Sequence, residues 1–392
     1  MAAAENKTVV ILGGAYAGLH VAHYVLKNHK TAKVILVSKN SHFYWNMASI
    51  RAIVPGQVKE ERILQPLSAA LSRYPAERWE LVVGSAEASD FAAKTVTVAV
   101  ASTENADAVS RTLTYDQLVL ATGARCAGDA NAVTWKASGT YEELAATLRA
   151  TADRVAAASH IVVAGGGSTG VEVAAELGFE FGKTKEIVLV TGDKQLLGGD
   201  SVAGSAAAEL AKLGVKVRTE ARVASVRQLE GGGEGEGAAA AAAGKTEVAL
   251  EGAEPILTDL YLPTMGLVPN SEFVDAKHLD DRKCVVVDDF YAVKDAEGVW
   301  AAGDIVSKPR AGFMIAQKQA AGLAKNLVAA LDGKAPAVVK LMPMDIFALA
   351  TGRSRGVGRM GPIKMLSFMV WMAKGRTLGV ERLKGYMDGS VA

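Results

Sequence analysis

Continuous apolar runs, each followed by a helical pattern, recur along the chain as far as about position 330. Residues 7–12 (KTVVIL) and 161–163 (IVV) predict buried parallel strands, because apolar side chains dominate their positions. The spacing then becomes helical, up to about Asn28 in the first case and about Leu177 in the second. Strands and helices that alternate in this order predict an α/β fold with two Rossmann-like units.

The same alternation predicts the remaining elements. We expect a hairpin from two strands at 91–100 and 110–115, around a polar tip. Helices are expected at 66–72, 141–158, 201–212 and 311–331. Further strands are expected at 33–37, 81–84, 118–123, 186–191, 215–218, 257–262 and 285–288, and just before Gly303-Asp304.

A glycine-rich loop joins strand to helix in both units. The second loop, residues 165–170 (GGGSTG), is a full G-x-G-x-x-G. In this context the first glycine permits the tight turn, the second lets backbone approach a pyrophosphate, and the third lets helix and strand pack closely. The helix N-terminus then offers N–H groups and a partial positive charge to phosphates. We therefore expect Gly165, Gly167, Ser168 and Gly170 to bind a dinucleotide.

The first loop, residues 13–18 (GGAYAG), departs from this pattern. Ala15 stands where the second glycine belongs. The acid expected about 20 residues later, for a ribose hydroxyl, is also absent: Ser38 or Asn40 would have to make that bond. The alternative interpretation is that the first Rossmann unit has lost its dinucleotide-binding site. In the second unit, Asp193 and Lys194 follow the corresponding strand with opposite charges, so the segment does not separate NADH from NADPH.

Composition and charge exclude several classes of function. The net charge of +1 argues against a general nucleic-acid binder. The only cysteines, Cys126 and Cys284, form no C-x-x-C, which disfavours a disulfide framework, a metal cluster and a dithiol centre and suits a reducing compartment. No run of about 18 apolar residues predicts a membrane span, and Ala2 replaces the glycine that N-myristoylation requires. Residues 230–244 are low in complexity and predict a hairpin tip without a function.

The end of the chain, residues 351–392, differs from the rest in charge. It carries eight Lys or Arg and two acids, with methionines, a tryptophan and other apolar residues between them. A basic helix with a broad apolar face suits a membrane surface. A subunit interface, as in a homodimer, and a lid packed over the site are the alternatives. The expected location is cytoplasmic, with peripheral contact to a membrane, a lipid droplet or the mitochondrial outer surface.

Four motifs in a fixed order carry a family resemblance. With A-T-G at 121–123, the second glycine loop, T-x-G at 264–266 and A-A-G-D at 301–304, the chain resembles the pyridine nucleotide–disulfide oxidoreductase superfamily over residues 7 to about 330. The resemblance implies FAD on the first domain and NADH or NADPH on a second domain inserted into it. The expected boundaries are 1–135 with 256–335 for the FAD domain, 136–255 for the NAD(P)H domain and 336–392 for a small C-terminal region.

The tail and the missing cysteine pairs favour one branch of this superfamily. Residues 350–358 and 378–387 look like the C-terminal region of the apoptosis-inducing-factor-like branch, which includes the ferroptosis suppressor protein family. This resemblance implies an FAD-dependent NAD(P)H:quinone oxidoreductase, in which hydride passes from NAD(P)H to FAD N5 and two electrons then reach a quinone such as ubiquinone. The alternatives are a type II NADH dehydrogenase of a respiratory chain and a redox-sensing interaction protein with incidental turnover.

The resemblance also implies roles for individual positions. Glu172 would lie near the nicotinamide, Lys136 near the flavin unless it is a solvated surface residue, and Gln317 at the flavin or quinone unless its helix only packs. The aromatic stretch 42–51 would line the flat ring system, with Arg51 as an anion partner, or would be a packed core turn. Expected FAD contacts are Gly13, Gly14, Ala15, Gly18, Ser38, Ala86, Ala121, Thr122, Gly123, Gly303 and Asp304, with Gly266 as a further cofactor contact.

Overall fold

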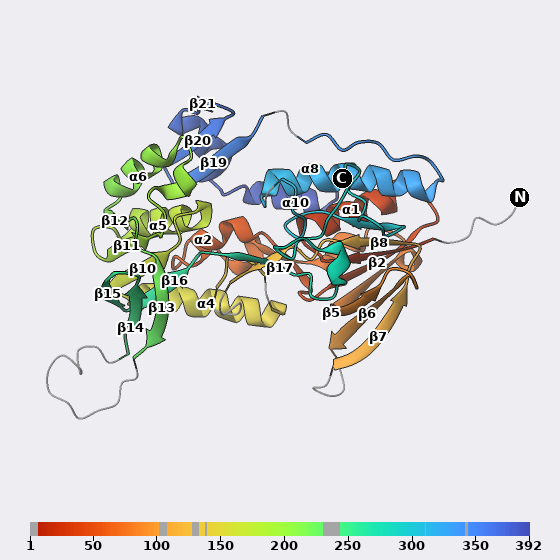
Figure 1. Ribbon diagram of the computed structural model, residues 1–392, viewed down its shortest axis with the longest axis horizontal. Coiled ribbons are helices and arrows are strands. Elements are labelled where there is room, and N and C mark those ends of the chain that lie inside the picture. The colour runs from red at the N-terminus through yellow and green to blue at the C-terminus, as the bar shows by residue number, and fades with distance from the viewer. Residues whose placement is uncertain are drawn as a thin grey trace, which may run out of the picture.

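The computed structural model describes residues 7–101, 108–127, 133–137, 139–229, 244–309, 311–341 and 344–392. Figure 1 shows two sheet-containing lobes side by side, with the C-terminal strands above the second lobe. The α/β class with two Rossmann-like units is confirmed. The low-complexity segment expected to form a hairpin tip lies, except for its last glycine, outside the described residues. None of the described helices combines the length and apolar character that crossing a bilayer requires.

The first lobe is built on a seven-stranded sheet, in the order β18-β8-β1-β2-β5-β6-β7. Its first five strands pair in parallel, and β5 continues past β2 to pair antiparallel with the β6–β7 hairpin. Helices α1 (Tyr16–Asn28) and α8 (Phe313–Leu331) pack against each other over this lobe (Figure 1). The strands are β1 (Thr8–Leu12), β2 (Lys33–Ser38), β5 (Trp79–Asp90), β6 (Thr95–Ala101), β7 (Ala108–Thr114), β8 (Gln117–Leu120) and β18 (Val299–Ala301).

The second lobe contains a parallel sheet in the order β12-β11-β10-β16. Helices α5 (Ser168–Phe181) and α6 (Ala203–Lys212) follow its strands, and a three-stranded antiparallel sheet, β13-β14-β15, adjoins it. Helix α4 (Tyr141–Ala157) leads into it and begins at a capping box between Thr140 and Glu143. The strands are β10 (His160–Ala164), β11 (Glu186–Val190), β12 (Val215–Arg218), β13 (Val223–Gln228), β14 (Thr246–Leu250), β15 (Ala253–Thr258) and β16 (Leu260–Pro263).

Two strand predictions were wrong. The single strand expected at 257–262 is two, because Asp259 interrupts it by accepting hydrogen bonds from the N–H groups of Ser159 and His160. The second of these strands, β16, pairs with β10, so the parallel sheet of the second lobe extends past the expected boundary at residue 255. Residues 285–288 form only isolated bridges, because no neighbouring strand runs beside them for more than one residue.

The C-terminal region is a small sheet with short helical turns, so the expectation of one basic helix with a broad apolar face was wrong. Strands β19 (Ile346–Thr351), β20 (Arg355–Met360) and β21 (Ile363–Lys364) form an antiparallel sheet that packs on α5. Val370 sits over Gly356 and Gly358 of β20, where a Cβ atom would lie 2.5 and 3.1 Å from its methyl groups. The helical pieces are α9 (Ser367–Val370), a π-helical turn (Trp371–Gly375) and α10 (Leu383–Met387).

Short elements complete the first lobe. Strands β3 and β4 pair in an antiparallel ribbon, and β9 pairs with β17 where the chain passes between the lobes. Helix α3 contacts α10, which joins the end of the chain to the first lobe. The bounds are β3 (His42–Tyr44), β4 (Leu64–Pro66), β9 (Ala124–Cys126), β17 (Leu267–Pro269), α2 (Ser49–Ala52) and α3 (Leu67–Leu71).

Candidate active site

One cavity of about 1190 Å³ contains residues of both glycine loops. Pockets for a single small ligand usually enclose about 300–1,000 Å³, so this cavity exceeds their range. Its walls come from the first lobe, the start of α5 and the C-terminal region. It therefore has the size and the two anion-binding helix ends that two large phosphate-containing ligands would need.

The first loop has the geometry that its glycines predict. Gly13 has φ +111°, and a Cβ there would lie 2.2 Å from the carbonyl oxygen of Ala121. A Cβ on Gly18 would lie 1.8 Å from the carbonyl oxygen of Gly13, so Gly18 allows the close packing and does not itself line the cavity. Ala15 is exposed at the cavity wall, and no side chain caps the helix behind it. The first N–H groups of α1 thus carry no side-chain cap.

The second loop repeats this arrangement. Gly165 has φ +119°, and a Cβ on Gly170 would lie 1.8 Å from its carbonyl oxygen. Gly167 has open space where a Cβ would stand, and it lines the cavity together with Ser168. Gly165 and Gly170 lie behind that wall, where they shape the turn. Thr264 braces the loop by donating to the carbonyl of Ala164 at 2.8 Å.

Most other predicted FAD contacts line the same cavity. Ser38 donates to the carbonyl oxygen of Asn40 at 2.7 Å, and both side chains are buried at the end of β2. Gly266 does not line the cavity: it has φ +71°, and its Cβ position would meet Ala127. The predicted residues found in the wall are Gly13, Gly14, Ala15, Ser38, Ala86, Ala121, Thr122, Gly123, Gly303 and Asp304.

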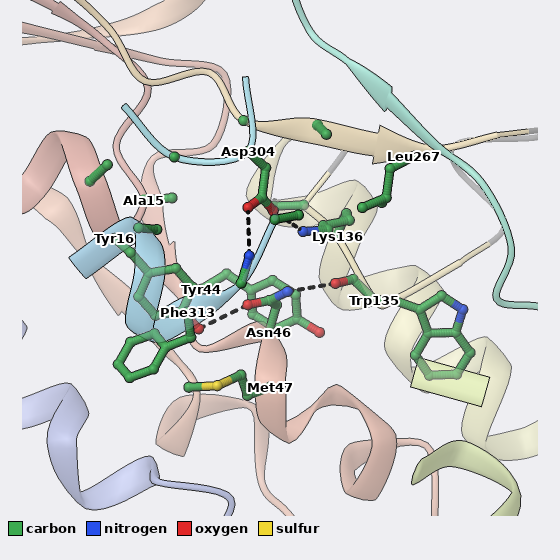
Figure 2. A pocket seen from close by; sticks show the side chains of 18 of the residues that line it. Ala15, Tyr16, Tyr44, Asn46, Met47, Trp135, Lys136, Leu267, Asp304 and Phe313 are labelled. Carbon is green, nitrogen blue, oxygen red and sulfur yellow. Dashed lines mark hydrogen bonds and ion pairs between the residues drawn. The ribbon is translucent and has the colours of Figure 1, made fainter. Parts of the chain in front are cut away.

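Asp304 and Lys136 form an ion pair in the cavity wall. Lys136 Nζ lies 2.5 Å from Asp304 Oδ2 (Figure 2). Asp304 Oδ1 accepts from the N–H of Gly312 at 3.2 Å. About a quarter of the Lys136 side chain is exposed, so the solvated-surface alternative does not describe it. The pair joins the end of β18 to the segment before α4, and both residues line the cavity.

The aromatic stretch 42–51 divides between the cavity and the core. Tyr44, Asn46 and Met47 line the cavity, whereas Phe43 and Trp45 are fully buried. Asn46 accepts from the Tyr16 hydroxyl at 2.8 Å and donates to the Trp135 carbonyl at 2.6 Å (Figure 2). The stretch therefore serves both as a packed turn and as a wall.

Arg51 does not have the predicted role of a cofactor anion partner. Its guanidinium is buried in a two-point pair with Glu176 of α5, at 2.8 and 3.2 Å. It also donates to the carbonyls of Gly375 and Arg376. With its donors turned to these groups and away from the cavity, Arg51 instead joins the two lobes to the C-terminal region.

Glu172 lines the cavity one turn into α5, and its carboxylate is held by the C-terminal region. Oε1 accepts from the N–H of Ala350 at 2.7 Å and lies 2.6 Å from Lys374 Nζ. Lys374 also donates to the carbonyl of Ala348 at 3.1 Å and lines the cavity beside Glu172. An acid of the helix that follows the second glycine loop and a base of the tail thus form one wall.

Gln317 does not line the cavity, in contrast to the prediction. Gln319, two positions further along the helix, is buried and does not line the cavity either. Gln319 accepts from the N–H of Gly303 at 2.8 Å and donates to the carbonyl of Lys308 at 2.6 Å. It fixes the backbone next to Asp304 and so supports the site from behind.

Sequence reasoning missed the C-terminal wall and its ion pairs. Glu172, Glu176 and Glu180 recur every four residues and so share one face of α5. Arg353 bonds Glu176 and Glu180 at 2.8 and 2.6 Å. Arg359 pairs with Asp200 at 2.7 Å and Arg355 with Glu209 at 3.7 Å. The acidic stripe, matched to a basic tail, was a signal in the sequence that could have revealed this contact.

The comparisons with known proteins agree with this architecture. Residues 7–322 match the family model of the pyridine nucleotide-disulphide oxidoreductases. The chain is 38% identical to oxidoreductase ptaL of Pestalotiopsis fici, over 98% of this chain and all of that protein. It is 26% identical to ferroptosis suppressor protein 1 of Xenopus tropicalis, over 96% and 95% of the two chains.

Solved structures share the fold at low sequence identity. The sulfide:quinone oxidoreductase of Aquifex aeolicus superposes with a TM-score of 0.74 at 18% identity, over 98% of this chain and 92% of that one. The NADH-bound water-forming NADH oxidase of Lactobacillus brevis gives 0.68 at 18% identity, over 91% and 75%. Together with the motif order and the paired glycine loops, the family-model match over residues 7–322 and the similarity to oxidoreductase ptaL show that the chain belongs to the pyridine nucleotide-disulphide oxidoreductases.

Proposed function

We propose that this protein is an FAD-dependent NAD(P)H:quinone oxidoreductase of the apoptosis-inducing-factor-like branch. The observation that carries the proposal is that residues of both glycine loops line one and the same cavity, which continues to an apolar wall from the C-terminal region. A flavin bound there would accept hydride from NADH or NADPH at N5 and pass two electrons to the acceptor. The full-length similarity to ferroptosis suppressor protein 1 supports the choice of branch.

The residues of the first lobe fit FAD. The wall runs from Ser85 and Ala86 past the Gly13 loop to Asp304 and Lys136. The uncapped N-terminus of α1 would bind the pyrophosphate, and the backbone at Ala86 would meet the adenine. Asp304 would accept from a hydroxyl of the ribityl chain, while its ion pair with Lys136 holds the carboxylate in place.

The start of α5 would bind the nicotinamide coenzyme. Gly167 and Ser168 would bind its pyrophosphate at the uncapped helix N-terminus. Glu172, one turn further along the cavity wall, would orient the nicotinamide, and Lys374 would hold the Glu172 carboxylate in place. No nucleophile or metal is needed, since the protein supplies orientation and electrostatics.

The acceptor end favours a flat apolar molecule over a protein disulfide. Phe347, Leu349 and Met365 of the C-terminal region line the cavity, as does Phe313 of α8. Both cysteines of the chain are free, and burial raises the pKa of the Cys126 thiol at the cavity, which opposes formation of a reactive thiolate. A quinone has the apolar ring and the hydrogen-bonding carbonyls that this end can accommodate.

Steady-state kinetics of the purified protein test the proposal. Denaturing extraction of the purified protein should release FAD. The rate of NADH or NADPH oxidation should be much higher with a soluble short-chain ubiquinone than with oxygen alone. Phe347→Ala should raise the KM for the quinone and leave ferricyanide reduction unchanged, with Val109→Ala at the distant hairpin as the matched control. Oxidation no faster with quinone than with oxygen would refute the proposal.

A further inference from the structure

Six large apolar side chains lie exposed within one short segment of the C-terminal region. Leu366, Ile363 and Phe368 expose 71, 64 and 61% of their surface, more than any other large apolar side chain that the structure describes. We name the whole set the apolar ridge: Met360, Ile363, Leu366, Phe368, Met369 and Met372. Isolated exposed apolar residues are ordinary, but a contiguous group marks an interaction site.

The ridge stands on a fixed support. Buried Val370 anchors its middle against Gly356 and Gly358 of β20. Met365 N–H donates to the carbonyl of Gly358 at 2.8 Å, and Trp371 Nε1 donates to the carbonyl of Arg353 at 2.6 Å. The buried and hydrogen-bonding groups of this segment therefore hold it in place while the ridge side chains point outward.

The ridge also borders the cavity. Met365 and Ala373, which lie between and just after the ridge residues, line the cavity wall. Whatever covers the ridge would therefore lie beside the acceptor end of the site. Since no described helix can span a bilayer, a lipid contact here would be peripheral.

We infer that the apolar ridge docks on the interfacial region of a lipid bilayer that carries anionic headgroups. Lys364 lies exposed within the ridge, and Arg376 lies exposed shortly after its end, whereas Arg353, Arg359 and Lys374 are paired inside the protein. Inserted apolar side chains beside exposed basic groups are the combination that membrane surfaces bind.

The same charge opposes a second copy as the occupant. A two-fold contact centred on the ridge would be self-complementary and would bring the two Lys364 ammonium groups together. A bilayer has no such conflict. Docking of the ridge does not depend on the enzyme's reaction, but delivery of a lipophilic acceptor from the bilayer to the cavity rests on the proposed function.

Vesicle co-sedimentation of the purified full chain tests the inference. The probes are vesicles of phosphatidylcholine alone and vesicles of phosphatidylcholine and phosphatidylserine in a two-to-one molar ratio. The wild type should bind the anionic vesicles, and Leu366→Glu with Phe368→Glu should lower the fraction bound at least tenfold. Val109→Glu with Leu257→Glu, which changes two exposed apolar residues elsewhere, should bind as the wild type does. Lys364→Gln should weaken binding to the vesicles that contain phosphatidylserine and should not change binding to the vesicles of phosphatidylcholine alone.

The following outcomes distinguish an effect on vesicle binding from a loss of folding and from a loss of enzyme activity. The ridge variant should keep its flavin content and its activity with a soluble acceptor, and Leu366→Met with Phe368→Leu should restore vesicle binding. No binding by the wild type, equal binding by the ridge variant, or a ridge-dependent dimer in light scattering without lipid would overturn the inference. Vesicle binding without quinone turnover would support the ridge and refute the proposed function.

Discussion

The carboxylate of Glu172 lies 2.6 Å from the ammonium of Lys374, although the two residues are far apart in the chain. Glu172 belongs to the helix that follows the second glycine loop, and Lys374 to the π-helical turn of the tail. Both line the cavity, so this pair is where the coenzyme loop and the C-terminal wall meet. Under the proposed function, coenzyme binding and the position of the tail are therefore physically connected at one contact.

This contact predicts non-additive kinetics. Glu172→Gln and Lys374→Met should each slow flavin reduction by NAD(P)H, because each leaves its partner without a counter-charge. The double variant should lose less than the sum, with a coupling of about 0.5–3 kcal/mol as is common for contacting residues. Stopped-flow absorbance of the flavin measures the rate. Lys183→Met, at an exposed lysine, is the control, and additive losses would contradict a shared role.

The third glycines of the two loops predict separable losses. A methyl group at Gly170 or at Gly18 would stand 1.8 Å from a carbonyl oxygen of its own loop. Gly170→Ala should therefore retain FAD and lose reduction by NAD(P)H, whereas Gly18→Ala should lose FAD itself. Flavin content and stopped-flow reduction distinguish the two.

Gly204 provides the matched control for these substitutions. It is exposed within α6, with open space at its Cβ position. Gly204→Ala should keep both activities and stabilise the fold by up to about 1 kcal/mol, since alanine favours a helix. If all three variants behaved alike, the loops would have no special role.

The ion pair of Asp304 and Lys136 predicts a change in FAD affinity. Asp304→Ala removes a largely buried acceptor and leaves Lys136 without its partner, so FAD should bind more weakly by about 1–3 kcal/mol. Fluorescence titration of the apoprotein with FAD measures this change. Asp289→Ala removes an exposed aspartate that pairs with Lys308 at 3.3 Å and should leave FAD affinity unchanged. Equal affinity in both variants would exclude Asp304 as an FAD contact.

The nucleotide loops could be predicted because their constraints are local. Gly13 and Gly165 have a positive φ, and a Cβ on Gly18 or Gly170 would lie 1.8 Å from the carbonyl oxygen of Gly13 or Gly165, so these demands act within one short loop. The burial of Val285 and Val287 could also be predicted from their apolar pattern. Strand formation there depends on a second strand running alongside, which the local sequence does not specify. Local pattern thus predicted the burial and not the pairing.

The C-terminal region could not be predicted in this way. Its basic residues suggested a membrane helix, yet several of them are neutralised by acids of α5 and α6, which lie far earlier in the chain. Arg51 was misassigned for the same reason, since its partner Glu176 belongs to the other lobe. A single sequence gives charges but not their long-range pairing.

The buried carboxylate of Glu176 predicts a large loss of stability. Its side chain is fully buried and holds Arg51 and Arg353, so Glu176→Gln should lower the free energy of unfolding by about 3–5 kcal/mol. Glu186→Gln removes a pair with Lys216 that is half exposed and should cost less than about 1 kcal/mol. Urea denaturation at matched flavin content measures both, and similar losses would show that the network is not a main support.

Two buried histidines of α1 predict that the free energy of unfolding falls with pH already above the pH range in which carboxylates titrate. Burial lowers the pKa of His20 and of His23 to about 4, so both are neutral in the folded protein near pH 6. The unfolded chain takes up these protons near pH 6.5, and each unit between the two pKa values is worth about 1.4 kcal/mol. The contribution is thus complete above pH 6.5 and is lost as the pH falls toward 4.

Denaturation between pH 7.5 and pH 4.5 checks this sign. The free energy of unfolding should fall across that interval in the wild type, and His20→Leu should reduce the slope because it removes one proton uptake by the unfolded state. His20 suits the test because its Nδ1 has no hydrogen-bond partner among the described residues, so leucine breaks no bond there. His23 is bonded to the Tyr74 hydroxyl and donates from Nε2 to the carbonyl of Tyr386 in α10, so its replacement would break a contact with the tail. An unchanged slope in His20→Leu would assign the acid sensitivity to other groups.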